Sequence, residues 1–509
     1  IKGFDSTIDI KGIKMVVTNQ SIEEQYFENI FYATGCKLNI TDLSVQGFRS
    51  AKGAFINTID TVLTLSGSLI QNSFIPNGRL INTKKGTCKI INSNISEVGQ
   101  LMNAVQMDII TFDGIILETS VFSNYMIELD QPKTVSVLNS RFSLTADTTE
   151  DILYSVISLI EPSLLVNVTN TEFIHSKTLK GALYLVLSSS NTTVNIWDSS
   201  FEDNTALGDG GGALTLSQVL SSTIWIRNST FHGNKAIGNE DKTGGRGGAI
   251  YMSSADSDKD KPTYKLEKCE FHGNLAQLYG GAIYVNGIPP EIASDVVFLG
   301  NQIINQGELI NHNIGSHPIK LELCTKNPME LFRQQSDRIV LTPNLTVSEV
   351  LTINELASDQ LITYPLYLIL VDMYNQVALD ENGARLDFTS SDPKFSMSTP
   401  FLFSTNGYFN LTGLSLKYMP EKSLTITLKT LAIVPFQQIS VIPKINQQEI
   451  VTNLKFRACI SGEILTQDQT CEECKPGFAL ITPKNNSYGP CVPCETTKMF
   501  CDGGSRVGP

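Results

Sequence analysis

Residues 135–142, Val-Ser-Val-Leu-Asn-Ser-Arg-Phe, contain the pattern that decides the fold. Two apolar residues, two positions apart, lead to Asn or Asp and then Ser or Thr, and a Phe follows two positions later. The pattern returns at residues 166–173, 194–201 and 224–231. A strand-like unit that repeats every roughly 20–40 residues is typical of a solenoid. Weaker copies end at Val45, Ile70, Ile95, Phe122, Phe271 and Phe298.

The unit has a physical logic that predicts a parallel β-helix. Alternating apolar residues place one face of a short strand inward, while Asn and Asp tolerate the left-handed backbone that turns the chain. Stacked coils then bury a continuous core that no single coil could bury. No helical stripe of apolar residues competes over residues 1–325. We therefore expect an all-β chain in which residues 1–328 form a right-handed parallel β-helix.

Two stacked inward rows are expected from this alignment. The aliphatic row consists of Val137, Val168, Ile196 and Ile226. The aromatic row consists of Phe142, Phe173, Phe201, Phe231 and Phe271.

A second signature occurs three times between residues 198 and 287. A Phe-x-x-Asn tetrad precedes a Gly-Gly-Ala-Leu or Gly-Gly-Ala-Ile motif each time. The tetrads and motifs begin at Phe201 and Gly211, at Phe231 and Gly247, and at Phe271 and Gly280. These paired motifs resemble the repeats of polymorphic outer-membrane proteins and related pectin-lyase-like adhesins, which implies the same β-helix. The glycines are expected to permit a tight bend where neighbouring coils approach closely. An active-site glycine loop is the alternative, but no Lys or Ser/Thr stands in the register of a phosphate-binding loop, and no helix follows.

Composition restricts the partners. The 509 residues carry a formal net charge of −13, which argues against nucleic acid and against an anionic membrane surface. No stretch of 18 apolar residues occurs, so membrane attachment is expected only through segments outside this chain. The sequence starts without Met or a signal peptide, and we interpret it as a mature or truncated segment of a longer protein.

Nine Asn-x-Ser/Thr sequons are spread over every region, as in a secreted glycoprotein. Asn228 occupies the turn position of the repeat, so its side chain is expected to belong to a stacked ladder rather than to carry a glycan. Glycans are expected on several of the other eight, which are Asn19, Asn39, Asn94, Asn167, Asn191, Asn344, Asn410 and Asn485.

Six of the ten cysteines lie in the last 51 residues. So small a region has too little core to fold without disulfides, and an even number of cysteines supports them. Connectivity is open among 15 possibilities. A zinc ribbon is the alternative, because two Cys-x-x-Cys pairs have the right spacing; the two extra cysteines and the sequon at Asn485 argue against it. The six are Cys459, Cys471, Cys474, Cys491, Cys494 and Cys501.

Two outer pairs, Cys36–Cys88 and Cys269–Cys324, stay open as further disulfides. Each pair is separated by about two coils, or roughly 9.6 Å of rise. A disulfide cannot bridge that distance unless a loop carries one sulfur back.

Residues 474–478, Cys-Lys-Pro-Gly-Phe, look like a turn of epidermal-growth-factor-like and ephrin-receptor-like modules. Residues 501–509 resemble the Cys-x-Gly-Gly-x-x-Ile-Gly-Pro-Lys segment of large surface proteins of ciliates and other protists. Val507 stands where that pattern has Ile, and the sequence ends before the Lys. In those proteins a β-helix ectodomain and cysteine-rich modules precede transmembrane helices. The resemblance implies an EGF-like module over residues 456–509 of a surface protein.

Between these regions the solenoid pattern stops. Strand-like runs such as Tyr367–Asp372 and Leu424–Thr430 are separated by polar turns, as in a β-sandwich. We expect residues 335–452 to form such a domain, which resembles immunoglobulin-like or filamin-like repeats and acts as a spacer.

The residues most able to do chemistry do not form a catalytic set. His232 and His272 each open a His-Gly-Asn triplet that repeats in register, and repetition indicates a structural turn, because catalysis needs one constellation only. The loop at residues 255–260 has three acids but lacks the Gly and distal Glu of a calcium-binding hand. Four further acids lie in or beside Gly-Gly loops without a polygalacturonase-like pattern: Asp203, Asp209, Glu240 and Asp241.

We therefore expect no catalysis, no metal and no cofactor. The predicted function is that of a structural and adhesive ectodomain of a larger, membrane-anchored surface protein. Its expected partners are other surface or extracellular proteins, or a second copy of the chain. A polysaccharide-binding or polysaccharide-cleaving β-helix is one alternative, which exposed aromatics on one sheet or a lone acidic cleft would favour. A subunit of an extracellular filament is another, because open strand edges permit end-to-end addition.

Overall fold

The computed structural model divides between Ser316 and His317 into two compact units. The residues that it describes are 6–16, 29–48, 52–73, 75, 77–119, 126–144, 153–188, 191–238, 244–255, 261–305, 307–336, 351–433, 449–460, 462–468, 470–479, 491–494, 500–503 and 506–508.

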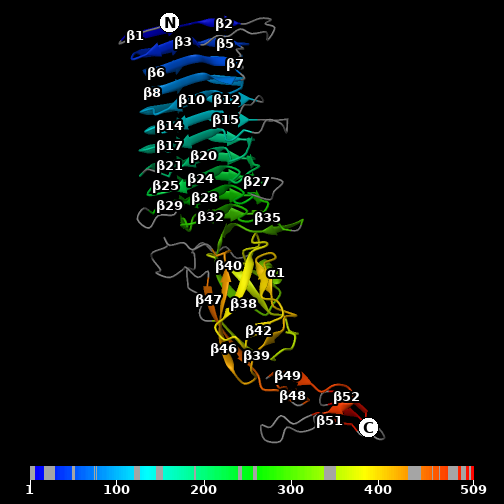
Figure 1. The fold of residues 1–509 in the computed structure, drawn as a ribbon. Helices are drawn as coiled ribbons and strands as arrows, with labels where there is room; N and C mark the ends of the chain where they lie inside the picture. The colour runs from blue at the N-terminus through cyan, green and yellow to red at the C-terminus, as the bar shows by residue number, and fades with distance from the viewer. Residues whose placement is uncertain are drawn as a thin grey trace. The chain divides into compact units, whose positions relative to one another are not determined.

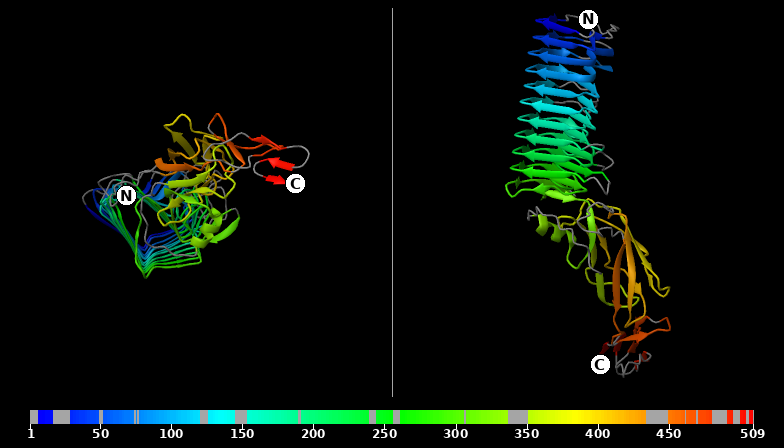
Figure 2. Two further views of the ribbon diagram at one scale, coloured as in Figure 1. Left: turned by 90° about the horizontal axis from the view of Figure 1, so that it is seen from below. Right: turned by 90° about the vertical axis from the view of Figure 1, so that its left-hand side faces the viewer.

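The first unit is a solenoid of stacked parallel strands (Figure 1). Among the described residues, its three sheets have 20, 11 and six strands, and successive coils lie one above another (Figure 2). The predicted all-β chain with a parallel β-helix is therefore confirmed. The 11-stranded sheet consists of β2 (Lys14–Val16), β5 (Ser44–Gln46), β7 (Leu69–Ser73), β9 (Asn94–Val98), β12 (Ile116–Thr119), β15 (Arg141–Leu144), β18 (Glu172–Ile174), β22 (Ser200–Glu202), β26 (Thr230–His232), β30 (Glu270–His272) and β34 (Val297–Leu299).

The 20-stranded sheet contains two rows of short strands, which we call row A and row B. The 15-residue strands β6 (Lys52–Ser66) and β8 (Asn77–Ile91) connect them, because β8 pairs with β10 (Met102–Val105) and also with β11 of row A. Row A includes β11 (Ile109–Asp113), β14 (Thr134–Leu138), β17 (Leu165–Thr169), β21 (Thr193–Trp197), β25 (Thr223–Arg227) and β29 (Thr263–Glu267). Row B includes β13 (Ile127–Asp130), β16 (Ile157–Ile160), β20 (Leu183–Val186), β24 (Leu214–Val219), β28 (Ile250–Ser254) and β32 (Ile283–Asn286).

Both predicted inward rows are present. Val137, Val168, Ile196 and Ile226 are successive partners in row A and are fully buried. The predicted phenylalanines pair in the 11-stranded sheet with ring centroids 4.8–5.1 Å apart and interplanar angles of 3–13°. That distance matches the strand spacing of about 4.8 Å, so each ring packs flat on the ring of the next coil.

One anchor of the repeat alignment is wrong. Ile95 and Phe142 both pair with Leu117, so Leu117 fills the aromatic row in the coil that the alignment had assigned to Phe122. Phe122 itself lies outside the described residues. The physical reason is that Gly114, at φ +65°, provides the left-handed turn that Asn or Asp provides in other coils.

The polar residues of the repeat turn the chain and bridge its coils. Asn139, Asn170, Asp198 and Asn228 have φ between +48° and +51°, the left-handed conformation that the sequence predicted. The hydroxyl that follows faces inward: Ser199 Oγ donates to Trp197 O at 2.7 Å and accepts from the backbone N–H of Thr171 in the preceding coil. Such a short polar side chain thus satisfies a backbone group of its own corner and one of the preceding coil.

A second, buried ladder runs through the asparagines of the Phe-x-x-Asn tetrads. Asn234 Nδ2 donates to Phe201 O at 2.9 Å and to Asn274 Oδ1 at 3.0 Å, and Asn234 Oδ1 accepts from the backbone and side chain of Asn204. The four asparagines at these positions are 0–1% exposed. Because each amide is used fully between coils, no buried polar group of the ladder lacks a partner. Its members are Asn204, Asn234, Asn274 and Asn301.

The Gly-Gly motifs lie where coils touch, as expected. A Cβ added to Gly248 would lie 2.0 Å from Gly281 O, and one added to Gly281 would lie 2.2 Å from His312 O. No side chain fits at such distances, so the backbones can approach only at glycine.

The second unit contains a β-sandwich whose core joins Leu321, Leu368, Phe409, Leu428 and Leu454. One sheet consists of β38 (Pro318–Cys324), β40 (Tyr367–Asp372) and β44 (Tyr408–Asn410). The other consists of β39 (Leu351–Leu356), β47 (Glu449–Phe456), β46 (Ser423–Thr430), β41 (Arg385–Ser390) and β43 (Phe401–Phe403).

The boundary between the solenoid and the sandwich differs from the expected one. Strand β38 pairs antiparallel with β40, so the sandwich begins before residue 335 and the solenoid ends before residue 328. Helix α1 (Pro328–Ser336) follows, and Asn327 caps it by accepting the N–H of Met329 at 2.9 Å.

Three disulfides connect consecutive cysteines at the C-terminal end: Cys459–Cys471, Cys474–Cys491 and Cys494–Cys501. The expected disulfide-rich region is therefore present, with a sequential connectivity that the sequence left open. The zinc ribbon is excluded, because its four cysteines belong to three different disulfides.

Candidate binding surface on the solenoid

The repeated histidines and the acid beside them belong to turns of the stack. His232 and His272 are register partners on β26 and β30, and His272 Nε2 lies 3.2 Å from Glu270 on its own strand. Asp203 has φ +51° and occupies the same turn position as Gly233 and Gly273 in later coils. Its carboxylate lies 3.7 Å from His175 Nε2, and both side chains are about half exposed. His232 and His272 therefore share one repeated strand position, and Asp203 shares a repeated turn position with Gly233 and Gly273.

The other acids that the sequence singled out form no cluster among the described residues. Asp209 is tied through its backbone carbonyl to Lys180 Nζ at 2.8 Å. Glu240, Asp241 and the acids of residues 256–260 lie outside the described residues.

The two tryptophans of the chain lie side by side on the outer face of row A. Trp197 is on β21 and Trp225 on β25, and each alternates with fully buried aliphatic neighbours. Their ring centroids are 5.6 Å apart at an interplanar angle of 83°, and both side chains are partly exposed. Such an edge-to-face pair covers one face of one ring, whereas the buried phenylalanines stack face to face.

Amides and cations surround the pair. In the column of Trp225, the preceding residue is Asn195 and the next is Lys265. Asn195 Nδ2 donates to Asn167 Oδ1 at 2.8 Å, which fixes the two amides to each other. The Arg227 guanidinium lies 5.8 Å from the centroid of the Trp225 ring. Aromatic rings, planar amides and cationic donors thus meet on a surface of four adjacent strands, β17, β21, β25 and β29.

Row B also carries outward aromatic residues, but they are packed. Tyr251 and Tyr284 are stacked with centroids 5.6 Å apart, Arg246 lies over the Tyr284 ring at 5.5 Å, and Tyr284 is 4% exposed. Burial, together with the Asp209 charge, raises the pKa of Tyr251. These rings therefore stabilise the solenoid rather than offer an open surface.

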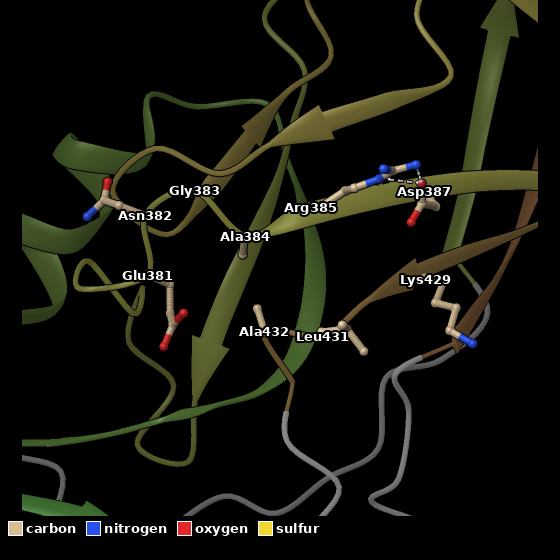
Figure 3. Close-up of a pocket in the computed structure, with 9 residues that line it drawn as sticks. All are labelled: Glu381, Asn382, Gly383, Ala384, Arg385, Asp387, Lys429, Leu431 and Ala432. Carbon is tan, nitrogen blue, oxygen red and sulfur yellow. Dashed lines mark hydrogen bonds and ion pairs between the residues drawn. The ribbon is translucent and has the colours of Figure 1, made fainter.

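The second unit has a shallow pocket of about 430 Å³ (Figure 3). Arg385 lies on its wall, but the guanidinium is already engaged by Asp387 at 2.6 Å and by the Phe401 ring at 4.4 Å. The exposed Leu431 and the Lys429 side chain, which Figure 3 shows pointing away from Glu381, complete a wall without converging polar groups. This pocket is as large as a ligand-binding site, but it lacks the converging polar groups that would bind and orient a ligand.

One group of potential metal ligands occurs among the described residues, formed by Cys459, Glu463 and Cys471. Its two sulfurs are bonded to each other, and Glu463 accepts two hydrogen bonds of 2.8 Å from Arg457. The set therefore has no thiolate ligand to offer.

The expected glycosylation sites differ in their surroundings. Asn94, Asn191 and Asn410 are exposed, and Asn39 and Asn167 are partly exposed. Asn228 donates to Asp198 Oδ1 at 2.6 Å, the ladder bond that the sequence predicted. The remaining three, Asn19, Asn344 and Asn485, lie outside the described residues.

The outer disulfides are absent: Cys36, Cys88, Cys269 and Cys324 are buried free thiols. Leu38, Leu63 and Cys88 are successive register partners, so Cys88 fills an apolar core position two strands away from the coil of Cys36. Cys269 takes the place of Ser229 in the next coil, and its Sγ donates to Glu267 O at 3.2 Å as a serine hydroxyl would. Both cysteines are thus explained by packing.

The fold defines the chain as a parallel β-solenoid protein with a disulfide-rich C-terminal region. No family model, no curated protein and no solved structure matches it. Within the described residues, no helix is long and apolar enough to cross a membrane. The disulfides suggest a secreted or extracellular protein.

The tryptophan pair was missed by the sequence reasoning. The available signal was position: Trp197 and Trp225 occupy outward positions beside the inward Ile196 and Ile226, where most copies carry small or polar residues. The repeat pattern is defined by the inward and turn residues, so it gave no information about these two outward tryptophans.

Proposed function

We propose that this chain is a non-catalytic, extracellular structural and adhesive ectodomain of a larger, membrane-anchored surface protein. The observation that carries the proposal is the use of buried polar residues. The side-chain amides of Asn234 and its counterparts form hydrogen bonds to neighbouring coils, and His232 and His272 are register partners in adjacent coils. A stack of this kind supplies a stiff support for surface contacts, since each coil is held by the next.

Two further observations support the location. Three disulfides staple the C-terminal region, as is common in oxidising compartments. The Gly-Gly-Ala motifs resemble those of pectin-lyase-like adhesins, and the Cys-Lys-Pro-Gly-Phe turn resembles that of EGF-like modules. Residues 501–509 resemble a segment of protist surface proteins in which transmembrane helices follow the ectodomain. Both features fit a protein that acts outside the cell.

The proposal is tested by adhesion and by turnover on the same preparation. Beads coated with the purified chain are expected to be retained on immobilised extracellular glycoprotein, or to aggregate with each other, whereas albumin-coated beads are not. Pectin, cellulose oligosaccharides and mannan incubated with the soluble chain, with or without calcium, should release no new reducing or unsaturated ends.

Matched variants separate surface contact from chemistry. Asp203→Asn and His232→Ala change the polar residues nearest to an enzyme-like arrangement and should leave bead retention unchanged. Retention at the albumin level on every surface, without self-aggregation, would overturn adhesion. Glycan cleavage that either variant abolishes would overturn the non-catalytic assignment.

A further inference from the structure

We infer that the outer face of row A around Trp197 and Trp225 is a binding site for a neutral glycan made of pyranose sugars. This inference rests on the proposed adhesive function and names its ligand. The site consists of Trp197, Trp225, Asn195, Arg227 and Lys265, which come from β21, β25 and β29.

The aromatic pair is the first argument. A tryptophan that serves packing is normally buried and gives its indole N–H to an acceptor. Here both rings stand on the outer face and are partly exposed, whereas their indole nitrogens are covered and have no hydrogen-bond partner in the described structure. The exposed ring faces, rather than the N–H groups, are therefore the parts of these tryptophans that a ligand can contact. The C–H face of a pyranose ring packs on such a surface, and exposed apolar area of this kind marks interaction sites.

The polar surroundings are the second argument. Sugar hydroxyls need donors and acceptors held in fixed directions beside the ring face. Asn195 is fixed by its bond to Asn167, and Arg227 lies over Trp225, so both groups are preorganised next to the rings. Successive strands are about 4.8 Å apart, which is close to the length of one pyranose unit. A glycan that runs along the stack can therefore place consecutive sugars on consecutive coils.

The charge distribution favours a neutral ligand over an acidic one. Arg227 is followed in its column by Glu267, and Lys265 lies 3.9 Å from Glu291. Each cation at the site is thus offset by a neighbouring carboxylate. Because the chain also carries a net charge of −13, a polyanion would gain little local attraction and meet overall repulsion.

The experiment uses a property of the composition. The chain has only two tryptophans, so its indole fluorescence reports on this site alone. Titration with cellohexaose or mannohexaose should change the emission saturably for at least one of them, whereas hexagalacturonate should not. Raising NaCl from 50 to 500 mM should change the affinity less than twofold.

Variants identify the residues. Trp225→Ala and Trp197→Ala should weaken retention on the immobilised sugar at least tenfold, while Trp225→Tyr should retain part of the binding. Asn195→Ala and Arg227→Gln weaken it without removing an aromatic ring. Leu138→Ala is the matched control, because Leu138 lies two strands away in the column of Trp197. Thermal unfolding of each variant separates lost binding from lost folding.

The outcomes distinguish this site from the proposed function. No response to any neutral hexasaccharide, with bead adhesion intact, overturns the glycan site and leaves adhesion standing. Loss of bead retention on deglycosylated protein surfaces in the tryptophan variants would show a protein-binding site instead. A change of emission on enzymatic deglycosylation alone would show that a glycan of the chain itself, at Asn167 or Asn191, covers the rings; that result also overturns the inference.

Discussion

The side-chain amide of Asn234 donates to the side-chain oxygen of Asn274 at 3.0 Å, although 40 residues separate them in sequence. Asn274 in turn donates to Asn301, only 27 residues further on. The ladder therefore keeps constant contacts between coils of unequal length. It starts at Ser176, whose Oγ lies 2.7 Å from Asn204 Oδ1, and ends at Asn313.

Breaking the ladder should destabilise the solenoid. Asn234→Ala removes the acceptor of the buried Asn204 backbone N–H and the side-chain bonds of Asn234 to Asn204 and to Phe201 O, so we expect a loss of roughly 2–4 kcal/mol of unfolding free energy. Asn228→Gly is the control, because it removes only one exposed ladder bond and glycine accepts φ +48°; it should cost less than about 1 kcal/mol. Denaturant unfolding followed by tryptophan fluorescence measures both. Equal losses would contradict the buried ladder's role.

The aromatic row provides a second test. Phe231 is fully buried between Phe201 and Phe271, with ring centroids 4.9 and 4.8 Å away. Phe231→Ala should cost roughly 3–5 kcal/mol, because neighbouring coils cannot collapse into the cavity. Leu299→Ala, at a side chain that is 62% exposed, should stay within about 0.5 kcal/mol of the native protein. A small effect at Phe231 would mean that the row is loosely packed.

Thiol labelling checks the disulfides. Burial raises the pKa of Cys88 to about 12 and that of Cys269 to about 11, so both should resist iodoacetamide at pH 8 in the native protein. Denaturation without reductant should expose four thiols, and reduction should expose all ten. Intact mass gives the counts. Labelling of more than four thiols before reduction would contradict the three disulfides.

Acid should loosen the contact between the sandwich and the disulfide-rich region. Burial alone would raise the pKa of Glu463, but hydrogen bonds from Arg457, from the Ile460 N–H and from Gln360 outweigh it and lower the pKa. The ionised Glu463 carboxylate therefore stabilises the folded state fully when the pH is above the ordinary glutamate pKa of about 4.3. This stabilisation is lost as the pH falls through the lower pKa of the folded state, because the unfolded chain binds the proton first.

Hydrogen exchange of the Ile460 amide, which donates to Glu463 at 2.9 Å, measures this loss between pH 5 and pH 3. Protection relative to the intrinsic rate should fall in the native protein. In Glu463→Gln it should be low throughout, whereas Asp468→Asn, at a carboxylate that is 82% exposed, should behave as the native protein does. Protection that is independent of pH would contradict the shift.

Mass analysis before and after glycosidase treatment tests the sequons. The side chains of Asn94, Asn191 and Asn410 are exposed, so we expect glycans there when the chain is secreted from a eukaryotic cell. Peptides that contain Asn228 should be unmodified, because that amide belongs to the corner ladder. An unchanged mass after treatment would remove this prediction.

The inward half of the fold was predictable because burial imposes a period. Ile196 and Phe201 recur in fixed spacing, and the structure stacks them with their counterparts as the sequence indicated. Leu117 was missed because Gly114 forms the same left-handed turn that Asn or Asp forms in other coils, so the sequence pattern did not match there. Cys269 suggested a disulfide, whereas a thiol replaces a serine hydroxyl there. The tryptophan pair was not predictable from the period, since outward positions are free to vary.

The ladders also determine how such a chain can evolve. Register depends on contacts between coils and not on the number of residues between them, as the unequal intervals around Asn274 show. Insertions between ladder members therefore alter the surface without shifting the stack, while substitution of a single ladder asparagine damages two coils at once. Natural selection can in this way diversify the exposed loops rapidly, over a support that itself must change slowly. A protein designer could use the same separation to graft new loops onto a stack left unaltered.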